Sequence, residues 1–497
     1  MPPAARINRL FSYLGLNVAF IVLLCIGFAI GGQPNPRLLF LVLLFALCST
    51  PLIDIDRLNG RFALLGMFMA VYFVSYGVND LTDLFAGTSH GRPDGALSET
   101  EAIILTGGVF WTLAYRSALS VAKSRPGAAA PRDWSMRTVL TVGLLLWVVG
   151  SYATYMWSVH IVPDTTNDAV RKGLSSVSPI AITAYMLGQT LQPLGILLPA
   201  YALYAHRKRY LLPLIVGMVV LQVALGFVVD IKGMAMFGGV LVIVTCVLVT
   251  GRIPKAWLVA GALFVVFVFP IFTAYRTAIH GDLGLARTAV IENFVAVLQK
   301  TIAAEDRVNT GRDRAETFFE RVSLKGSTQM IVEGVENGVG FQHGHTLEPI
   351  LATFIPRVLW SDKPDVPTGQ LVNKTFHVTD TDDIWISPSH LGELYWNFGW
   401  AGVIVGMSIF GLLCGSVGAR CDMTETRTVT RLLVLVLTIK QSIVSFEGAI
   451  APTYVVWLRS VAAIGVLHLL FARLPVTARS LSAARLGHGK LFPNLLS

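Results

Sequence analysis

The sequence has few charged residues for its length. Only 14% of its 497 residues are Asp, Glu, Lys or Arg, whereas 54% are hydrophobic. A water-soluble domain usually carries about 25% charged residues, so a soluble fold would leave its surface short of polar groups. The apolar residues also lie in runs of about 20, which is long enough to cross a bilayer. The composition therefore predicts a membrane protein and excludes a set of soluble domains.

The sequence also lacks two patterns that would indicate other kinds of protein. Its apolar runs do not alternate with polar residues, so a transmembrane β-barrel is excluded. Cysteine is scarce, and the cysteines lie in apolar runs or on the predicted cytoplasmic side, so no disulfide framework is expected. The five residues, which we expect to pack as small apolar groups, are Cys25, Cys48, Cys246, Cys414 and Cys421.

Long stretches with almost no charge occur twelve times along the chain. Inside a bilayer a helix satisfies its backbone hydrogen bonds within one segment, so each stretch is predicted to be a membrane-spanning helix. The sequence therefore predicts an all-α polytopic membrane protein with about 12 transmembrane helices. The stretches are 11–30, 38–53, 62–79, 102–121, 138–157, 179–205, 210–229, 234–250, 256–275, 396–418, 432–451 and 453–472.

The basic residues predict the orientation of these helices. With a cytoplasmic N-terminus, the cytoplasmic loops, tails and adjoining helix ends contain 21 Lys and Arg residues against five acids. The short loops on the other side contain five basic residues against nine acids. Because Lys and Arg accumulate in cytoplasmic loops, both termini are predicted to be cytoplasmic. The net charge of +9 is thus an orientation signal, and no nucleic-acid partner is expected.

One loop is much longer than the others. Residues 276–390 separate the ninth and tenth predicted helices on the extracytoplasmic side. Within this loop, 283–305 and 313–334 have apolar residues at helical spacing. They are expected either as amphipathic helices in the plane of the membrane interface or as part of a small soluble cap. The predicted regions are helices 1 to 9 (1–275), the loop (276–390), helices 10 to 12 (391–472) and a basic cytoplasmic tail (473–497).

A polar motif inside this loop is the first candidate for a functional site. The segment FIPRVLWSDKP places Arg357 and Lys363 between prolines that restrict the backbone. Arg suits bidentate contacts to phosphate, and Lys acts as a point charge, so the two residues are candidates for binding phosphate. On physical grounds alone the alternative is favoured, in which Trp360 and Lys363 anchor the loop at the membrane interface.

A second motif, SPSHLGELYWNFGW, opens the tenth predicted helix. Glu393 and Asn397 are four residues apart and His390 lies one turn earlier, so all three share a helical face. A carboxylate at the mouth of a membrane helix is costly unless it faces a cavity or a partner, which makes Glu393 a functional candidate. The alternative is helix capping by Ser387 or Ser389, with Glu393 in the first turn.

The two motifs together resemble one family. The combination of G-x-T and IPR-x-x-W-x-x-KP with a later G-E-x-Y-x-N-F-G, over residues 344–400, resembles the Wzy-type oligosaccharide repeat-unit polymerases. These enzymes are related to the O-antigen ligases. A looser similarity occurs at Asp230-Ile231-Lys232-Gly233 and at Tyr275-Arg276. The resemblance implies a glycosyltransferase of the bacterial inner membrane that joins glycans carried on undecaprenyl diphosphate at the outer face.

The resemblance also implies roles for particular residues. Such a reaction needs a base near the attacking sugar hydroxyl, and we assign this role to Glu393 or His390. It also needs cations for the departing diphosphate and polar groups for the substrate. The residues assigned to these tasks are Lys232, Arg276, Arg321, Arg357, Lys363, Tyr395 and Asn397. Lipid-linked oligosaccharides and the bilayer are the expected partners, with a flippase and a chain-length regulator as further candidates.

No cofactor and no metal are expected. The acids at Asp380, Asp382 and Asp383 have the chemistry to hold a hard cation, but a run of acids in a loop is usually solvated. Two other functions stay open. An O-antigen ligase-like enzyme would differ only in its acceptor. A secondary transporter or an exporter of lipid-linked oligosaccharide also fits, because twelve helices with both termini inside is a transporter plan.

Overall fold

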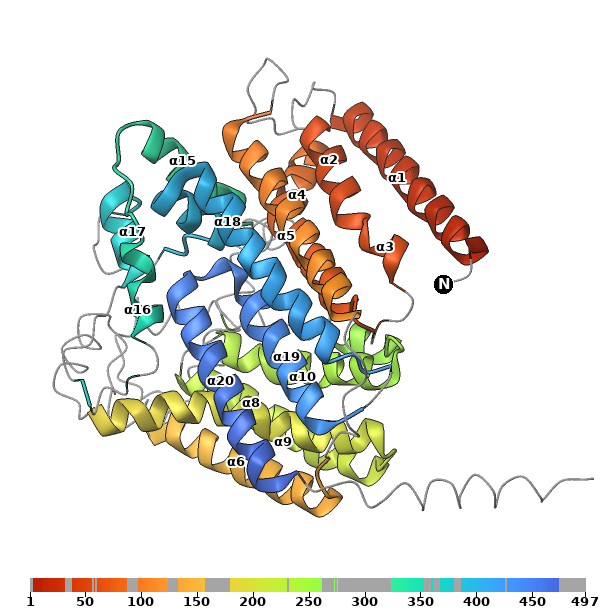
Figure 1. Cartoon of the computed structure of the whole chain (residues 1–497), viewed down its shortest axis with the longest axis vertical. Coiled ribbons are helices and arrows are strands. Elements are labelled where there is room, and N and C mark those ends of the chain that lie inside the picture. Colours follow the sequence, from red (N-terminus) through yellow and green to blue (C-terminus); the bar gives the residue numbers. More distant parts are fainter. Residues whose placement is uncertain are drawn as a thin grey trace, which may run out of the picture.

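Helices make up most of the described part of this chain in its computed structural model (Figure 1). Its described residues are 84% helical and contain no β-strand. They are residues 3–31, 38–55, 58, 60–86, 97–123, 133–156, 179–229, 232–261, 272, 275, 323–352, 355, 359–360, 367–379, 386–424 and 427–472.

Eight spans in this part of the chain are long and apolar enough to cross a membrane, which confirms an all-helical, multi-pass membrane protein. They comprise α1 (Pro3–Gly31), α4 (Ala63–Ala86), α5 (Glu99–Lys123), α6 (Met136–Met156), α9 (Leu212–Val229), α18 (His390–Arg420), α19 (Val429–Thr438) with the turns that follow it, and α20 (Ile450–Phe471). Three further apolar helices occupy predicted spans: α2 (Leu38–Ser49), α8 (Pro179–Ala205) and α10 (Lys232–Thr250). The stretch 256–275 lies mostly outside the described residues, so the count of 12 stays a prediction.

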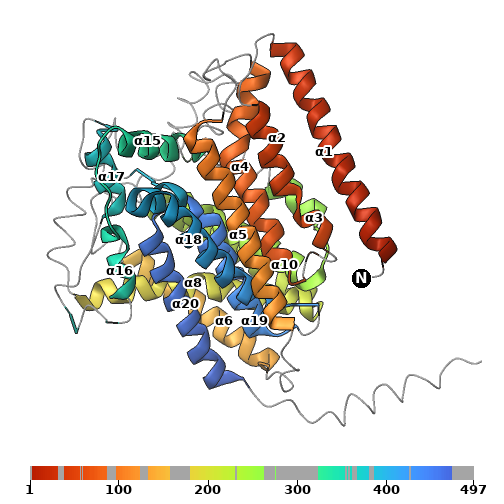
Figure 2. The same ribbon diagram turned by 45° about the horizontal axis from the view of Figure 1, so that its top comes forward.

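Two pairs of helices pack closely because glycines lie at their contacts. α5 and α18 run side by side (Figure 1, Figure 2), and a Cβ atom on Gly411 of α18 would lie 2.3 Å from the Trp111 carbonyl oxygen of α5. In the α6–α8 pair, a Cβ atom on Gly150 would lie 2.6 Å from Gln192 N. Helices surrounded by lipid associate largely through van der Waals contact, which small residues increase by letting the backbones approach.

Four short helices form a layer at the end of the bundle where α18 begins, and we call them the cap layer. They are α15 (Lys325–Glu336), η4 (His345–Leu347), α16 (Glu348–Leu351) and α17 (Thr368–Phe376), on the left of Figure 1. Ile331 of α15, Val372 of α17 and Trp396 of α18 form a buried apolar cluster that packs the cap layer on the bundle. α15 overlaps the helix expected at 313–334, whereas the one expected at 283–305 lies outside the described residues.

Two membrane helices are interrupted near the cap layer. The backbone dihedral angles of α18 are not helical at Phe398 and Gly399. The φ of 59° at Gly399 lies in a region that favours glycine. After α19 the chain forms a π-helical turn, η5 (Ile439–Ile443), and a 3-10 turn, η6 (Val444–Glu447), before α20 begins. The span predicted at 432–451 is therefore present as Val429–Glu447, but its second half is not a regular α-helix.

Backbone groups near both interruptions are paired with other segments. Gln342 N, just before the cap helix η4, donates a hydrogen bond to the Trp396 carbonyl oxygen at 2.9 Å. Ser389 N, just before α18, donates to the Glu447 carbonyl oxygen at 3.1 Å. Irregular backbone is tolerated at membrane depth only where protein or water satisfies it. These contacts therefore stabilise the interruptions and join them to the cap layer and to the start of α18.

The close packing of α5 on α18 predicts the effect of adding one methyl group. Gly411→Ala is expected to destabilise the protein by about 1–3 kcal/mol, because the new Cβ would overlap the Trp111 carbonyl oxygen. Gly465→Ala on α20 is the matched control, since no described atom outside its own stretch of helix lies within 4 Å of its Cβ position. Thermal unfolding of both variants in detergent would measure the difference, and equal melting temperatures would contradict the packing.

Candidate functional site

The start of α18 is tied to the cap layer by its capping residue. Ser389 is the N-cap residue, and its Oγ accepts a hydrogen bond from Gly392 N at 3.1 Å. The same Oγ lies 2.8 Å from Thr328 Oγ1 of α15. The φ of 58° at Ser389 is uncommon for a residue other than glycine, and such a conformation costs about 1–3 kcal/mol. The capping role proposed for this serine is confirmed, and contacts on both sides hold its strained backbone.

Glu393, the carboxylate candidate, lies one turn further along α18 and is fully buried, with 0% of its surface exposed. Its Oε2 accepts a hydrogen bond at 2.7 Å from the backbone N of Ile450, the first residue of α20. A helix N-terminus has unpaired N–H groups and favours a negative charge, so Glu393 caps α20. Its Oε1 makes no close hydrogen bond among the described residues, but the Thr346 side chain of η4 interacts with the carboxylate. One oxygen of the carboxylate therefore supports the fold, while the other makes no close hydrogen bond of its own.

His390 lies among aromatic rings at the same end of the bundle. Its Nδ1 is 2.8 Å from the Phe446 carbonyl oxygen, and because a carbonyl oxygen only accepts, Nδ1 carries the proton. The imidazole stacks on the Phe446 ring at a centroid distance of 4.7 Å and lies close to Phe410 and Tyr454. Its buried Nε2 has no hydrogen-bond partner among the described residues. In the neutral ring, Nε2 is therefore an acceptor without a donor.

Asn397 and Tyr395 are both engaged with other parts of the protein. Asn397 Nδ2 donates to the Glu393 carbonyl oxygen at 2.7 Å and to Thr346 Oγ1 at 2.8 Å. The Tyr395 hydroxyl donates to Glu99 Oε1 at 2.9 Å, joining α18 to α5. The contact from Asn397 to Glu393 confirms that these two residues lie on one helical face. Both side chains are therefore engaged with protein groups in this structure, and their assignment to the substrate stays a prediction.

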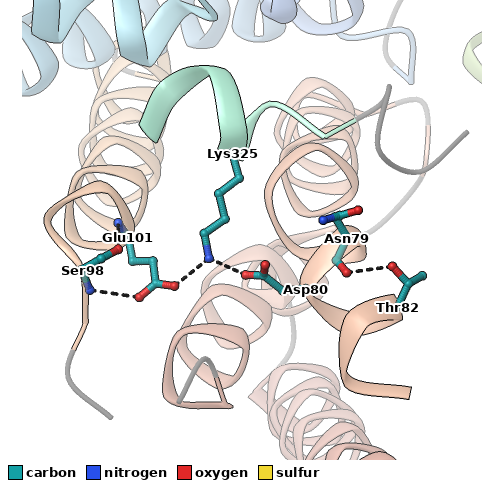
Figure 3. A network of polar contacts seen from close by, with 6 residues as sticks. All are labelled: Asn79, Asp80, Thr82, Ser98, Glu101 and Lys325. Carbon is teal, nitrogen blue, oxygen red and sulfur yellow. Dashed lines mark hydrogen bonds and ion pairs between the residues drawn. The ribbon is translucent and has the colours of Figure 1, made fainter. Parts of the chain in front are cut away.

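A buried ion cluster, which the sequence analysis missed, joins the cap layer to two membrane helices (Figure 3). Lys325, at the start of α15, places its Nζ 2.5 Å from Asp80 Oδ2 of α4 and 2.6 Å from Glu101 Oε1 of α5. The ammonium group also lies 4.4 Å above the ring centre of Phe40 in α2. All three charged side chains are almost completely buried. Burying an unpaired charge in such a place costs free energy. The cluster is therefore a specific connection of α15 to α4 and α5.

The second oxygen of Glu101 completes a helix cap. Glu101 Oε2 accepts from Ser98 N at 3.1 Å, and Ser98 Oγ accepts from Glu101 N at 3.2 Å. This reciprocal pair is a capping box that begins α5, and the sequence Ser-x-x-Glu is its usual signal. That signal could have identified Glu101 at the helix start. It could not have identified Lys325 as the partner, because 224 residues separate them.

The cations assigned to the diphosphate cannot be related to this geometry. Arg276, Arg321, Arg357 and Lys363 lie outside the described residues. Lys232 begins α10, but its side chain is not among those described. The diphosphate site stays a prediction, and so does the solvated state of the acids at 380–383, which also lie outside.

The comparisons with known proteins show no relative. No protein-family model matches the chain, and no curated protein or solved structure shows significant similarity to it. Among the residues that the structure describes, no group of three metal-ligating side chains is close enough to hold a metal ion. What the site contains is therefore a buried carboxylate oxygen and a buried imidazole nitrogen that make no close hydrogen bond among the described residues.

Removing the buried lysine is expected to loosen the cap layer. Lys325→Met keeps the length of the side chain but leaves Asp80 and Glu101 buried without their cation, and the expected cost is about 3–5 kcal/mol. The matched control is Lys374→Met on α17, whose side chain is exposed. Thermal unfolding and limited proteolysis of the purified protein would measure the effect. Equal stability of the two variants would show that the ion cluster does not hold the cap layer.

Proposed function

We propose that this protein is a membrane glycosyltransferase that polymerises lipid-linked oligosaccharides. The single observation that carries the proposal is the buried carboxylate of Glu393, in the motif that resembles the Wzy-type polymerases, whose Oε1 makes no close hydrogen bond among the described residues. A polar oxygen buried without a hydrogen bond costs free energy, so it needs a reason. Acceptance of a proton from a substrate hydroxyl gives it one.

The proposed reaction joins two lipid-linked glycans. A hydroxyl oxygen of the acceptor repeat unit attacks the anomeric carbon of the donor sugar, and the bond from that carbon to the diphosphate oxygen breaks. The hydroxyl proton passes to Glu393 or His390, and polyprenyl diphosphate leaves as the anion. Lys232, Arg276, Arg321, Arg357 and Lys363 are the cations proposed to stabilise its charge.

Access to Glu393 requires movement, because its carboxylate is closed off from solvent in this structure. The nearest layer outside it is formed by the cap helices, and Asn397 ties η4 to α18 by way of Thr346. Loop or cap movements that admit substrate and exclude water are common in enzymes. We therefore propose that the cap layer opens to admit the substrate and closes over the reaction.

The proposed location is the bacterial inner membrane, with both termini in the cytoplasm and the cap layer outside. Described arginines near the opposite ends of the bundle helices support this orientation. Arg61 and Arg116 lie near the ends of α4 and α5 away from the cap layer, and Arg420 ends α18. This distribution follows the positive-inside rule.

Two rival functions remain, and one structural observation favours the first of them. Secondary transporters bind substrates at interrupted membrane helices, and here α18 and the α19–α20 segment are both interrupted. This favours a transporter or an exporter of lipid-linked oligosaccharide as the second candidate. An O-antigen ligase-like enzyme would use the same carboxylate and differ in its acceptor.

Deletion of the gene and one isosteric substitution test the polymerase. Deletion is expected to leave single repeat units on the surface lipid. Glu393→Gln is expected to give the same result at normal protein levels, with chain extension lowered roughly 10²-fold or more, because it keeps the acceptor for Ile450 N but removes the base. Glu348→Gln, at a half-exposed carboxylate of the cap layer, is the control. Persistence of long chains in the deletion would refute the polymerase, and loss of all surface sugar would favour an exporter or a ligase.

The orientation has its own test. Reporter fusions after Glu320 are expected to give an extracytoplasmic signal, and fusions after Arg207 a cytoplasmic one, because basic residues concentrate on the cytoplasmic side. Alkaline phosphatase and green fluorescent protein, which are active on opposite sides of the inner membrane, would report the result. A cytoplasmic signal at Glu320 would place the cap layer on the wrong side for this reaction.

A further inference from the structure

A lysine without a counterion lies inside one of the membrane spans. Lys440 belongs to the span Val429–Glu447 and to its π-helical turn, η5. The side chain is partly buried, and its Nζ lies 5.4 Å from the centre of the Phe237 ring of α10. With the residues that the structure describes, this Nζ forms no ion pair and no hydrogen bond. An aromatic ring only partly replaces the hydration that an ammonium group loses, so the site favours a bound anion.

The span that carries Lys440 is enclosed by other helices and is not a lipid-facing surface. Of this span 67% is buried, compared with 17% of the α1 span and 11% of the α20 span. η5 contacts α4 and α20, and the ammonium group itself reaches α10. Lys440 lies roughly 16 Å along the span from Val429, at about 1.5 Å per residue. An ionisable side chain that faces the interior of a membrane bundle marks a substrate or ion pathway.

The irregular backbone at Lys440 is a second, independent observation. π-helical turns are rare and occur frequently at functional sites. The Ser445 hydroxyl donates a hydrogen bond to the Lys440 carbonyl oxygen at 3.1 Å, which satisfies this carbonyl within the irregular segment. The same segment continues through η6 to Phe446, whose carbonyl oxygen accepts a hydrogen bond from His390 Nδ1 at 2.8 Å. One short stretch of chain therefore connects the unpaired lysine to the candidate base.

We propose that Lys440 binds the diphosphate of the lipid-linked substrate. The inference rests on the glycosyl transfer proposed above, because that reaction brings a polyprenyl diphosphate to this bundle. Phe237, the ring beneath the ammonium group, lies in the second turn of α10, and α10 begins at Lys232, one of the cations assigned to the diphosphate. An ammonium group has three donors and acts as a point charge, so it suits phosphate oxygens. Lys440 stabilises the charge of the departing diphosphate, while Glu393 or His390 accepts the hydroxyl proton.

Binding of farnesyl diphosphate to the purified full-length protein tests this role without turnover. Calorimetry in detergent measures the affinity. We expect Lys440→Met to bind roughly tenfold or more weakly than the wild type, because a charge-assisted hydrogen bond is lost, and Lys440→Arg to keep most of the affinity. The matched control is Lys255→Met, at an exposed lysine beyond the far end of α10, which should bind like the wild type. Without ligand, Lys440→Met should melt no lower than the wild type, because it removes an unpaired charge from the bundle.

The outcomes separate this inference from the proposed function. Equal affinity of the wild type and Lys440→Met would overturn the role of Lys440 and leave the polymerase standing. Failure of the wild type to bind farnesyl diphosphate would instead contradict a lipid diphosphate substrate, and with it the polymerase. Phosphatidylglycerol that displaces the probe as well as farnesyl diphosphate does would make Lys440 a contact for ordinary lipid headgroups, and it would overturn the inference. A lower melting temperature of ligand-free Lys440→Met would do the same, because it would show a structural role.

Discussion

A charge buried in a membrane protein must be paired, and this requirement determines how the cap layer is attached. Lys325 enters the bundle from α15 and contacts carboxylates on α4 and α5, which are far from it in the chain. The desolvation cost of the ammonium group is offset only when both carboxylates are in place. The cap layer therefore has one specific position over the bundle. The first turn of α18, which bonds to α15 through Ser389, is held by the same arrangement.

The interruptions of α18 and of the α19–α20 segment have a common physical consequence. Each interruption leaves backbone groups near the cap layer without a partner in their own helix. Backbone groups of other segments form hydrogen bonds with them. Glu393 belongs to this system because it caps α20, so its burial has a structural cause whatever its chemistry. A single carboxylate that caps a helix with one oxygen, while the other makes no close hydrogen bond, is consistent with a site built into a rigid frame. The proposed catalytic role of Glu393 rests on that second oxygen.

Hydropathy predicted the membrane class and the positions of most of the helices, because membrane helices must be long and apolar. It placed the start of the tenth helix at residue 396, six residues late, since the first turns of α18 contain His390 and Glu393 and do not read as apolar. The capping signal at Ser389 marked the true start. The turns after α19 were missed, although residues 439–447 include Lys440, Gln441 and Glu447, because their shape depends on contacts with the start of α18. Within the site, spacing correctly placed Glu393 and Asn397 on one face. The sequence could not predict the Lys325 cluster, because its partners Glu101 and Asp80 are 224 and 245 residues away along the chain.

Paired buried charges hold the cap layer on the membrane helices. A double-mutant cycle of Lys325→Met and Glu101→Gln, followed by thermal unfolding in detergent, measures this pairing directly. The two substitutions are expected to be non-additive, with a coupling free energy of at least about 1 kcal/mol, because either one alone removes the same ion pair. Effects that add to within about 0.3 kcal/mol would show that the two side chains act independently and that their pairing does not hold the cap layer.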